Sequence, residues 1–114
     1  MKNQLLKITL IALLSSLAFA NSELERKCNN GNAGSCGALG DLYRYGYGVK
    51  QDYNKAMEFY GKACEMGEAV GCSALGDLYY VMKDYNKAME FYGKACEMGE
   101  AKGCGAYKII KSYL

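Results

Sequence analysis

The feature that most constrains this chain is a duplicated stretch of eighteen residues. Residues 52–69 and residues 84–101 share the sequence DYNKAMEFYGKACEMGEA. A second match, ALGDLY, covers residues 38–43 and 74–79 and precedes each copy. Paired segments at this spacing are typical of two-helix repeats. The sequence therefore predicts a solenoid, in which each repeat packs against its neighbours.

The first twenty residues have the pattern of a secretory signal peptide. Lys2 and Lys7 precede an apolar run at residues 8–14, and small residues stand at Ala18 and Ala20. We expect cleavage after Ala20, which would give a secreted product in the periplasm or outside the cell. The alternative is an uncleaved membrane anchor, but the apolar run is short for a bilayer span.

The charge of the chain excludes two classes of partner. Two of the 14 basic residues lie in the predicted signal peptide, and the remaining 12 balance the 12 acidic residues. A chain without net basic charge is not expected to bind nucleic acid or an anionic membrane surface. We expect no membrane contact after the signal peptide is removed.

The six cysteines form three pairs, each with a spacing of eight residues. An even number of cysteines in a small exported chain predicts disulfides. Each pair is centred on a predicted turn, so local bridges are favoured among the fifteen possible connectivities. Metal binding is the alternative for these thiols, but this is not a zinc spacing and the chain has no histidine. The sequence thus predicts no metal, no cofactor and these three bridges: Cys28–Cys36, Cys64–Cys72 and Cys96–Cys104.

The apolar periodicity divides the rest of the chain into helical segments. After residues 1–20, a partial opening helix is expected at 22–30, followed by a unit at 33–67, a second at 68–99 and a C-terminal cap at 100–114. Asp52 is a suitable N-cap and Gly67 a suitable C′ residue. In the cap, Lys108 stands at the position of the close-contact glycines of the units and Lys111 at that of a core tyrosine, which predicts a wet outer surface. The predicted fold class is all-α, a solenoid of αα-hairpin repeats clamped by disulfides.

The helical spacing also separates core positions from exposed ones. Tyrosines at helical spacing in a repeat protein are usually packing residues. We therefore expect Tyr43, Tyr60, Tyr79 and Tyr92 to pack in the core. Residues opposite the apolar stripe of the first helix of each unit form the candidate recognition face: Asp41, Arg44, Tyr45, Asp77, Tyr80 and Val81.

Several residues of the first unit carry a family resemblance. Ala38-Leu39-Gly40, Tyr43, Gly46-x-Gly48-Val49, Asp52, Lys55-Ala56, Phe59-Tyr60, Lys62-Ala63 and Gly67 resemble the Sel1-like repeat. With the paired Cys64 and Cys72, the chain is similar to the Helicobacter cysteine-rich protein family. The resemblance implies stacked αα-hairpins, each clamped by its own disulfide, in a right-handed superhelix. It also implies penicillin binding and slow β-lactamase activity, although no catalytic residue can be carried over.

The residues themselves favour a different function. The Ser-x-x-Lys, Ser-Asp-Asn and Lys-Thr-Gly motifs of a serine β-lactamase do not occur, and there is no histidine. After residue 20 the serine hydroxyls are Ser22, Ser35, Ser73 and Ser112, and the catalytic residues are unknown. The alternative is a non-catalytic interaction module whose ligand is a protein, or a cell-wall peptide that a β-lactam resembles. An inert remnant of a longer repeat array is a third possibility.

Overall fold

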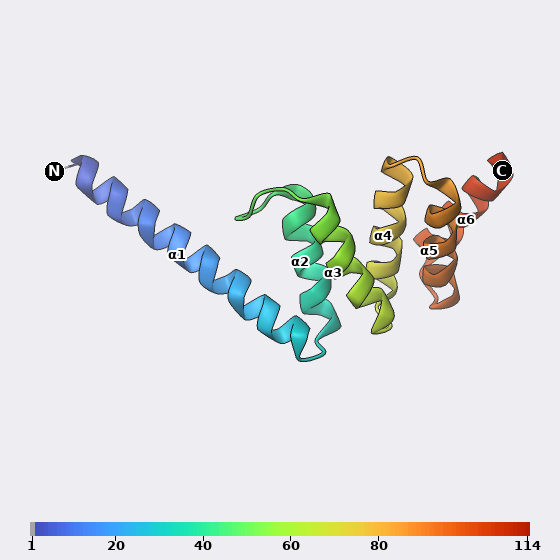
Figure 1. Cartoon of the computed structure of the whole chain (residues 1–114), viewed down its shortest axis with the longest axis horizontal. Coiled ribbons are helices and arrows are strands. Elements are labelled where there is room, and N and C mark those ends of the chain that lie inside the picture. The colour runs from blue at the N-terminus through green and yellow to red at the C-terminus, as the bar shows by residue number, and fades with distance from the viewer. Residues whose placement is uncertain (1) are drawn as a thin grey trace.

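The duplicated sequence folds into a row of antiparallel helices. The computed structural model describes the backbone of residues 2–114 and the side chains of residues 4, 7, 8 and 18–114. These residues form six helices and no strand, which confirms the predicted all-α class. The helices are α1 (Lys2–Asn29), α2 (Ala33–Tyr45), α3 (Tyr53–Glu65), α4 (Ala69–Val81), α5 (Tyr85–Glu97) and α6 (Ala101–Tyr113). Their principal extents are 63 × 29 × 21 Å, and α1 runs away from the stacked body (Figure 1).

Side-chain caps begin three of the helices. The Asn32 carboxamide accepts from the Ser35 amide at 2.9 Å, and the Asp52 carboxylate accepts from the Lys55 amide at 3.1 Å. Asp84 caps the second copy in the same way. Such caps satisfy backbone donors that have no partner within the helix. The Asp52 cap confirms the prediction, as does Gly67, which follows α3 with a φ of +90°.

The three predicted disulfides are confirmed. They close the hairpins α1–α2, α3–α4 and α5–α6, with Cα–Cα distances of 4.7, 4.6 and 4.5 Å. The sequence units, however, are α2–α3 and α4–α5, so each bridge joins one unit to its neighbour rather than the two helices of one unit. The bridges therefore strengthen the junctions on which a linear repeat array depends.

Aromatic packing holds the two helices of each unit together. The rings of Tyr43 and Phe59 stack with centroids 5.7 Å apart, and those of Tyr79 and Phe91 do so at 5.5 Å. Tyr60 is almost fully buried, at 1% exposure. Tyr92 is also buried, so the predicted packing role of the four tyrosines is confirmed.

The C-terminal helix α6 differs in part from the expected cap. Lys108 and Lys111 are exposed, as predicted for a wet outer face. Ile109 and Tyr113 are also exposed, at 61% and 84%. Polar and apolar side chains therefore share the outer surface of α6, because no later helix covers them within the described residues.

The structure also bears on the cellular compartment of the protein and on the predicted signal peptide. Three disulfides in a chain of this size are typical of proteins in an oxidising compartment outside the cytoplasm. In the described part of the chain, no helix combines the length and apolarity that a bilayer span requires. Helix α1 runs without a break over residues 2–20 of the predicted signal peptide and residues 22–29 of the predicted opening helix. The proposed cleavage after Ala20 stays a prediction.

Candidate recognition surface

A buried tyrosine in the second helix of each unit supports the acidic residue of the first helix. The Tyr60 hydroxyl donates to an Asp41 carboxylate oxygen at 2.5 Å, and the Tyr92 hydroxyl donates to Asp77. Burial raises the pKa of both phenols, and the neighbouring carboxylates raise it further. Each hydroxyl therefore keeps its proton and fixes the position of its carboxylate at neutral pH.

These tyrosines reach the first helix because a glycine faces each ring. A Cβ atom added at Gly40 would lie 2.4 Å from Cδ1 of Tyr60, and one at Gly76 would lie 3.0 Å from Cδ1 of Tyr92. A side chain at either position would displace the ring. The ALGDLY segment thus couples a close approach at glycine to a fixed carboxylate at the next residue.

A row of charges crosses the three first helices. Arg44 on α2 lies 3.6 Å from the Asp77 carboxylate on α4, and the ammonium group of Lys102 on α6 lies 2.8 Å from the same group. Both Arg44 and Asp77 are half-buried. Asp77 therefore links consecutive units and is only partly available to a ligand.

The other predicted recognition residues are open to solvent. Asp41, Tyr45, Tyr80 and Val81 are all exposed, the last three at 52%, 51% and 56%. The guanidinium of Arg44 lies 5.1 Å from the ring centroid of Tyr45. The structure therefore divides the six residues into a paired charge link and four exposed side chains, and their role in recognition stays a prediction.

Two apolar hollows flank Tyr80, and sequence reasoning missed most of their lining. Their volumes are about 210 and 410 Å³. Tyr80 and Ile110 line both hollows. The smaller one is completed by Tyr92, Ala106 and Ile109, and the larger one by Tyr85, Tyr113 and Leu114. A signal was present, because Ile109 and Tyr113 follow Cys104 at the spacing with which Asp41 and Tyr45 follow Cys36.

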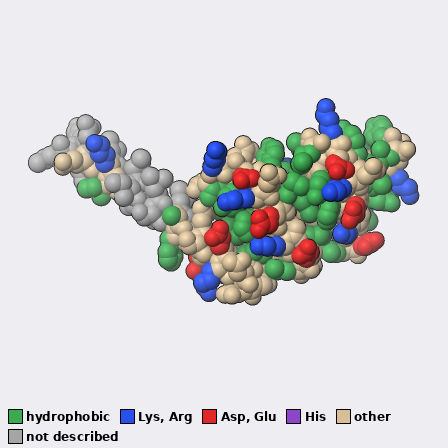
Figure 2. All heavy atoms as spheres, in the orientation of Figure 1, with side chains coloured by type: hydrophobic (Ala, Val, Ile, Leu, Met, Phe, Trp, Pro, Cys, Tyr) green, Lys and Arg blue, Asp and Glu red, His purple; other side chains and the backbone are tan. Residues whose placement is uncertain are grey.

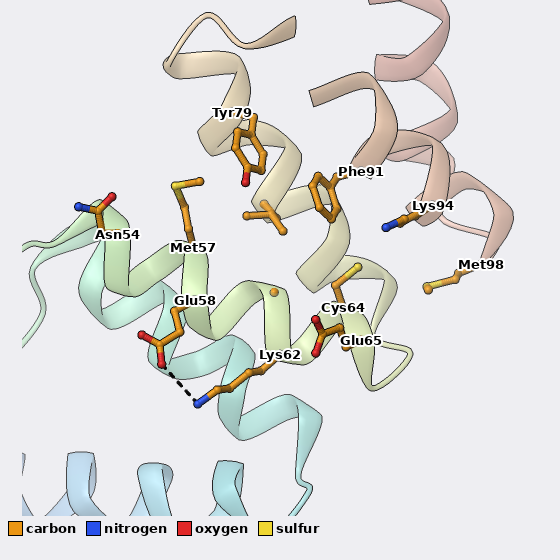
Figure 3. Close-up of a pocket in the computed structure, with 12 residues that line it drawn as sticks. Asn54, Met57, Glu58, Lys62, Cys64, Glu65, Tyr79, Phe91, Lys94 and Met98 are labelled. Carbon is orange, nitrogen blue, oxygen red and sulfur yellow. Dashed lines mark ion pairs between the residues drawn. The ribbon is translucent and has the colours of Figure 1, made fainter. Parts of the chain in front are cut away.

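A larger groove lies on another part of the molecule (Figure 3). It has a volume of about 700 Å³ and is formed by α3, α4 and α5. Tyr79 and Phe91 face it beside Met57, while Glu58 and Lys62 form an ion pair of 3.5 Å at its edge. None of the six predicted recognition residues is among the described residues that line it.

The visible surface carries charges of both signs. Figure 2 shows acidic and basic side chains interspersed over the body, without a large area of one sign. This distribution agrees with the balanced charge of residues 21–114.

Of the four serines after residue 20, Ser35 and Ser73 are buried, while Ser22 and Ser112 are exposed. Ser73 is 1% exposed, and its hydroxyl lies 3.1 Å from the Val70 carbonyl and 3.0 Å from a Glu100 carboxylate oxygen. Ser35 is also buried, and the Ser112 hydroxyl lies 2.6 Å from the Ile109 carbonyl. A substrate could not reach Ser73 without opening the helix junction.

All six cysteines are held in disulfides. Among the described residues, no group of three or more potential ligands gathers where it could hold a metal ion. The thiols are thus absent as ligands and as nucleophiles while the bridges stay oxidised.

Comparison with known proteins agrees with this architecture. The model of the Sel1 repeat matches residues 33–68 and 69–100. Among solved structures, the chain is similar to cysteine rich protein B of Helicobacter pylori, with 34% identity and a TM-score of 0.71 over 75% of this chain and 67% of that chain. It is also similar to a Sel1 repeat protein from Oxalobacter formigenes, with 25% identity and a TM-score of 0.69 over 73% of this chain and 36% of that one. No curated protein matches the chain.

Proposed function

Because the chain belongs to the Sel1 repeat family, we propose that it binds a peptide segment of another protein through the first helices of its units. Such repeats serve as scaffolds for protein interaction, since stacked helix pairs present a continuous surface without catalytic chemistry. We further propose that the chain acts outside the cytoplasm after removal of residues 1–20.

One observation carries this proposal: exposed Tyr80 stands between two apolar hollows on the surface predicted to bind. Tyrosine gives a large, rigid contact area that is part apolar and part polar, and it is frequent where binding energy is concentrated. The hollows beside it would take apolar side chains of the partner. Val81, Ile109 and Tyr113 extend the exposed apolar area around them.

Site-specific photo-crosslinking tests the proposal. A photoreactive phenylalanine analogue is placed at Tyr45, at Tyr80 or, as a control, at Glu90, which is exposed on α5. We expect the first two positions to give an adduct with the same partner, and Tyr80→Ala to weaken that partner's binding. Adducts formed only at Glu90 would place binding on the other helices and refute the proposal.

The β-lactamase activity implied by the family resemblance stays a separate prediction. The sequence has no histidine base and no Ser-x-x-Lys pair to activate a serine, so we expect turnover far below the median of about 10 s⁻¹ for enzymes. The assay is hydrolysis of a chromogenic cephalosporin by wild type and by a variant with Ser22, Ser35, Ser73 and Ser112 changed to alanine. Fast turnover that this variant loses, while its circular dichroism is unchanged, would identify a serine enzyme.

The proposed export has its own measurement. Cleavage by signal peptidase after Ala20 gives a protein that begins at Asn21. The intact mass of the protein recovered from outside the cytoplasm should match residues 21–114. A mass that still includes residues 1–20 would refute the proposed site.

A further inference from the structure

A small acidic pocket lies between the first helices of the two units, at the other end of the recognition surface from Tyr80. It has a volume of about 200 Å³, and three glycines are among the residues that line it. The only charged side chains among its described lining residues are Asp41 on α2 and Glu68 at the start of α4. The Glu68 carboxylate packs against the backbone of Gly37, where an added Cβ would lie 2.8 Å from Oε1.

The two carboxylates are close enough to affect one another. Burial raises the pKa of Glu68, and the negative charge of Asp41 raises it further. No lysine or arginine among the described side chains forms an ion pair with either group. Tyr60 donates one hydrogen bond to Asp41 but brings no positive charge.

The second unit shows which chemical group satisfies such a carboxylate. Asp77 follows Cys72 at the spacing with which Asp41 follows Cys36, and it also accepts from a buried tyrosine. There, the ammonium of Lys102 lies 2.8 Å from the carboxylate. At the first unit's pocket, the residue that corresponds to Lys102 is Val70 on α4, which lines the pocket and is 62% exposed.

We propose that the pocket formed by Asp41, Glu68 and Gly37 binds a primary ammonium group of a peptide ligand, in the place that Lys102 fills in the second unit. This proposal deepens the peptide-binding function and rests on it for its biological partner. A water molecule takes about 30 Å³, so the pocket admits an ammonium group and a few methylenes. The ammonium could come from a lysine side chain or from a peptide N-terminus.

The probes are chosen to separate these two sources. Amide chemical shifts of the oxidised chain are followed by NMR during titration with Nα-acetyl-lysine amide, which carries only a side-chain ammonium, or with glycine amide, which carries only an α-ammonium. Diacetylated lysine amide is the uncharged control, since acetylation removes the charge. We expect saturable shifts at Gly37, Val70 and Gly71 with at least one charged probe and none with the control.

Substitutions taken from the second unit make the test specific. Val70→Lys should supply the ammonium from within the chain and weaken binding of the charged probe at least tenfold. Glu68→Gln should also weaken that binding, because it removes a negative charge from the pocket. Glu65→Gln changes the net charge equally at an exposed site outside the pocket and should leave binding unchanged. Unchanged melting temperatures would show that all three variants fold.

Three results would overturn the proposal: no saturable shifts with either charged probe, equal shifts with the diacetylated probe, or full binding by Val70→Lys. None of them would affect crosslinks at Tyr80, which test the wider peptide-binding surface. Conversely, probe binding in the pocket without crosslinks at Tyr45 or Tyr80 would retain the ammonium site and remove the extended surface.

Discussion

The connections between the two helices of each unit differ in length by four residues, yet the helices pack in the same way. In the first unit six residues, 46–51, and the cap Asp52 separate α2 from α3, while in the second only Met82, Lys83 and the cap Asp84 separate α4 from α5. The stacked aromatic pairs have an interplanar angle of 9° in both units. The shared ALGDLY segment and the duplicated helix therefore determine the packing, while the connecting loop can vary.

The units differ more in their charges than in their backbones. Asp77 in the second unit is held by Arg44 and Lys102, whereas Asp41 in the first has only the hydrogen bond from Tyr60 among the described contacts. Sequence divergence at Val70 and Lys102 is responsible for much of this difference. The first unit therefore keeps an open acidic pocket, while Lys102 of the C-terminal helix α6 fills the corresponding position beside the second unit.

The largest expected effect on stability comes from the disulfide at the junction of the two full units. Replacing Cys64 and Cys72 with alanine should lower the free energy of unfolding by about 2–3 kcal/mol, the chain-entropy value for a loop of this length. Urea denaturation under oxidising conditions measures the loss. The Cys28→Ala/Cys36→Ala variant removes a loop of equal length at the end of the array and is the matched control.

The central variant should also broaden or split the unfolding transition, since it weakens the interface between the two full units. The control variant should keep a single sharp transition. A central variant as stable as wild type would show that helix packing alone couples the units.

The next effect concerns the two glycines beneath the tyrosine rings. Gly40→Ala should destabilise the protein by about 1–3 kcal/mol, since its Cβ would overlap the ring of fully buried Tyr60. Gly76→Ala should cost less, because its Cβ would lie farther from Tyr92, at 3.0 Å rather than 2.4 Å. Thermal melts followed by circular dichroism compare the two.

Gly61→Ala is the control for the intrinsic effect of alanine in a helix. Its Cβ would meet only Leu75, at 4.0 Å, so this variant should be neutral or more stable. If Gly40→Ala behaved like Gly61→Ala, the close approach would not be a requirement of the repeat.

A smaller effect is expected from the two aspartates. Asp77→Asn should destabilise the protein by about 0.5–1 kcal/mol more than Asp41→Asn, because only Asp77 pairs with Arg44 and Lys102. The difference should shrink in about 1 M salt, where the screening length is only about 3 Å. Equal losses at low salt would show that the charge row does not link the units.

Much of this architecture could be predicted because it is local in sequence. The duplicated letters give α3 and α5 the same length and the same caps, and the spacing of the cysteines gives the three bridges. The pairing of Asp77 with Arg44 and Lys102 could not be predicted, since these residues lie far apart in the chain and meet only when the helices stack. The acidic pocket was missed for the same reason, because it requires Glu68 of the junction to fold back against Gly37.

The shortened loop also carries a feature that the sequence did not reveal. Lys83 has a φ of +63°, in the left-handed region, and it is the only non-glycine residue with a positive φ in the described part of the chain. The left-handed conformation costs an L-residue about 1–2 kcal/mol, partly offset by the greater freedom of glycine when unfolded. Lys83→Gly should therefore stabilise the protein by about 0.5–1 kcal/mol in urea denaturation.

Gly46 ends α2 in the first unit with a φ of +72° and provides the reverse experiment. Gly46→Ala should destabilise the protein, since it introduces the strain that Lys83→Gly removes. A destabilising Lys83→Gly would show that the lysine side chain makes a contribution larger than its backbone strain.

The smallest expected effect tests the unbalanced charge of the first unit through pH. The pKa of Glu68 is raised, so the folded chain holds a proton more strongly than the unfolded chain does. Its contribution to stability is therefore complete below the unfolded pKa of about 4.3 and is lost as pH rises through the folded pKa. Glu68→Gln should thus be slightly more stable than wild type at pH 7, and the difference in melting temperature should disappear as the solution is acidified below about pH 4.

Glu65→Gln is the control for a change in net charge. Val70→Lys should instead lower the pKa of Glu68, because a nearby ammonium favours the ionised form. A Glu68→Gln variant that is less stable than wild type at pH 7 would show that the ionised carboxylate already has a partner. The pocket of the first unit would then not carry an unbalanced charge.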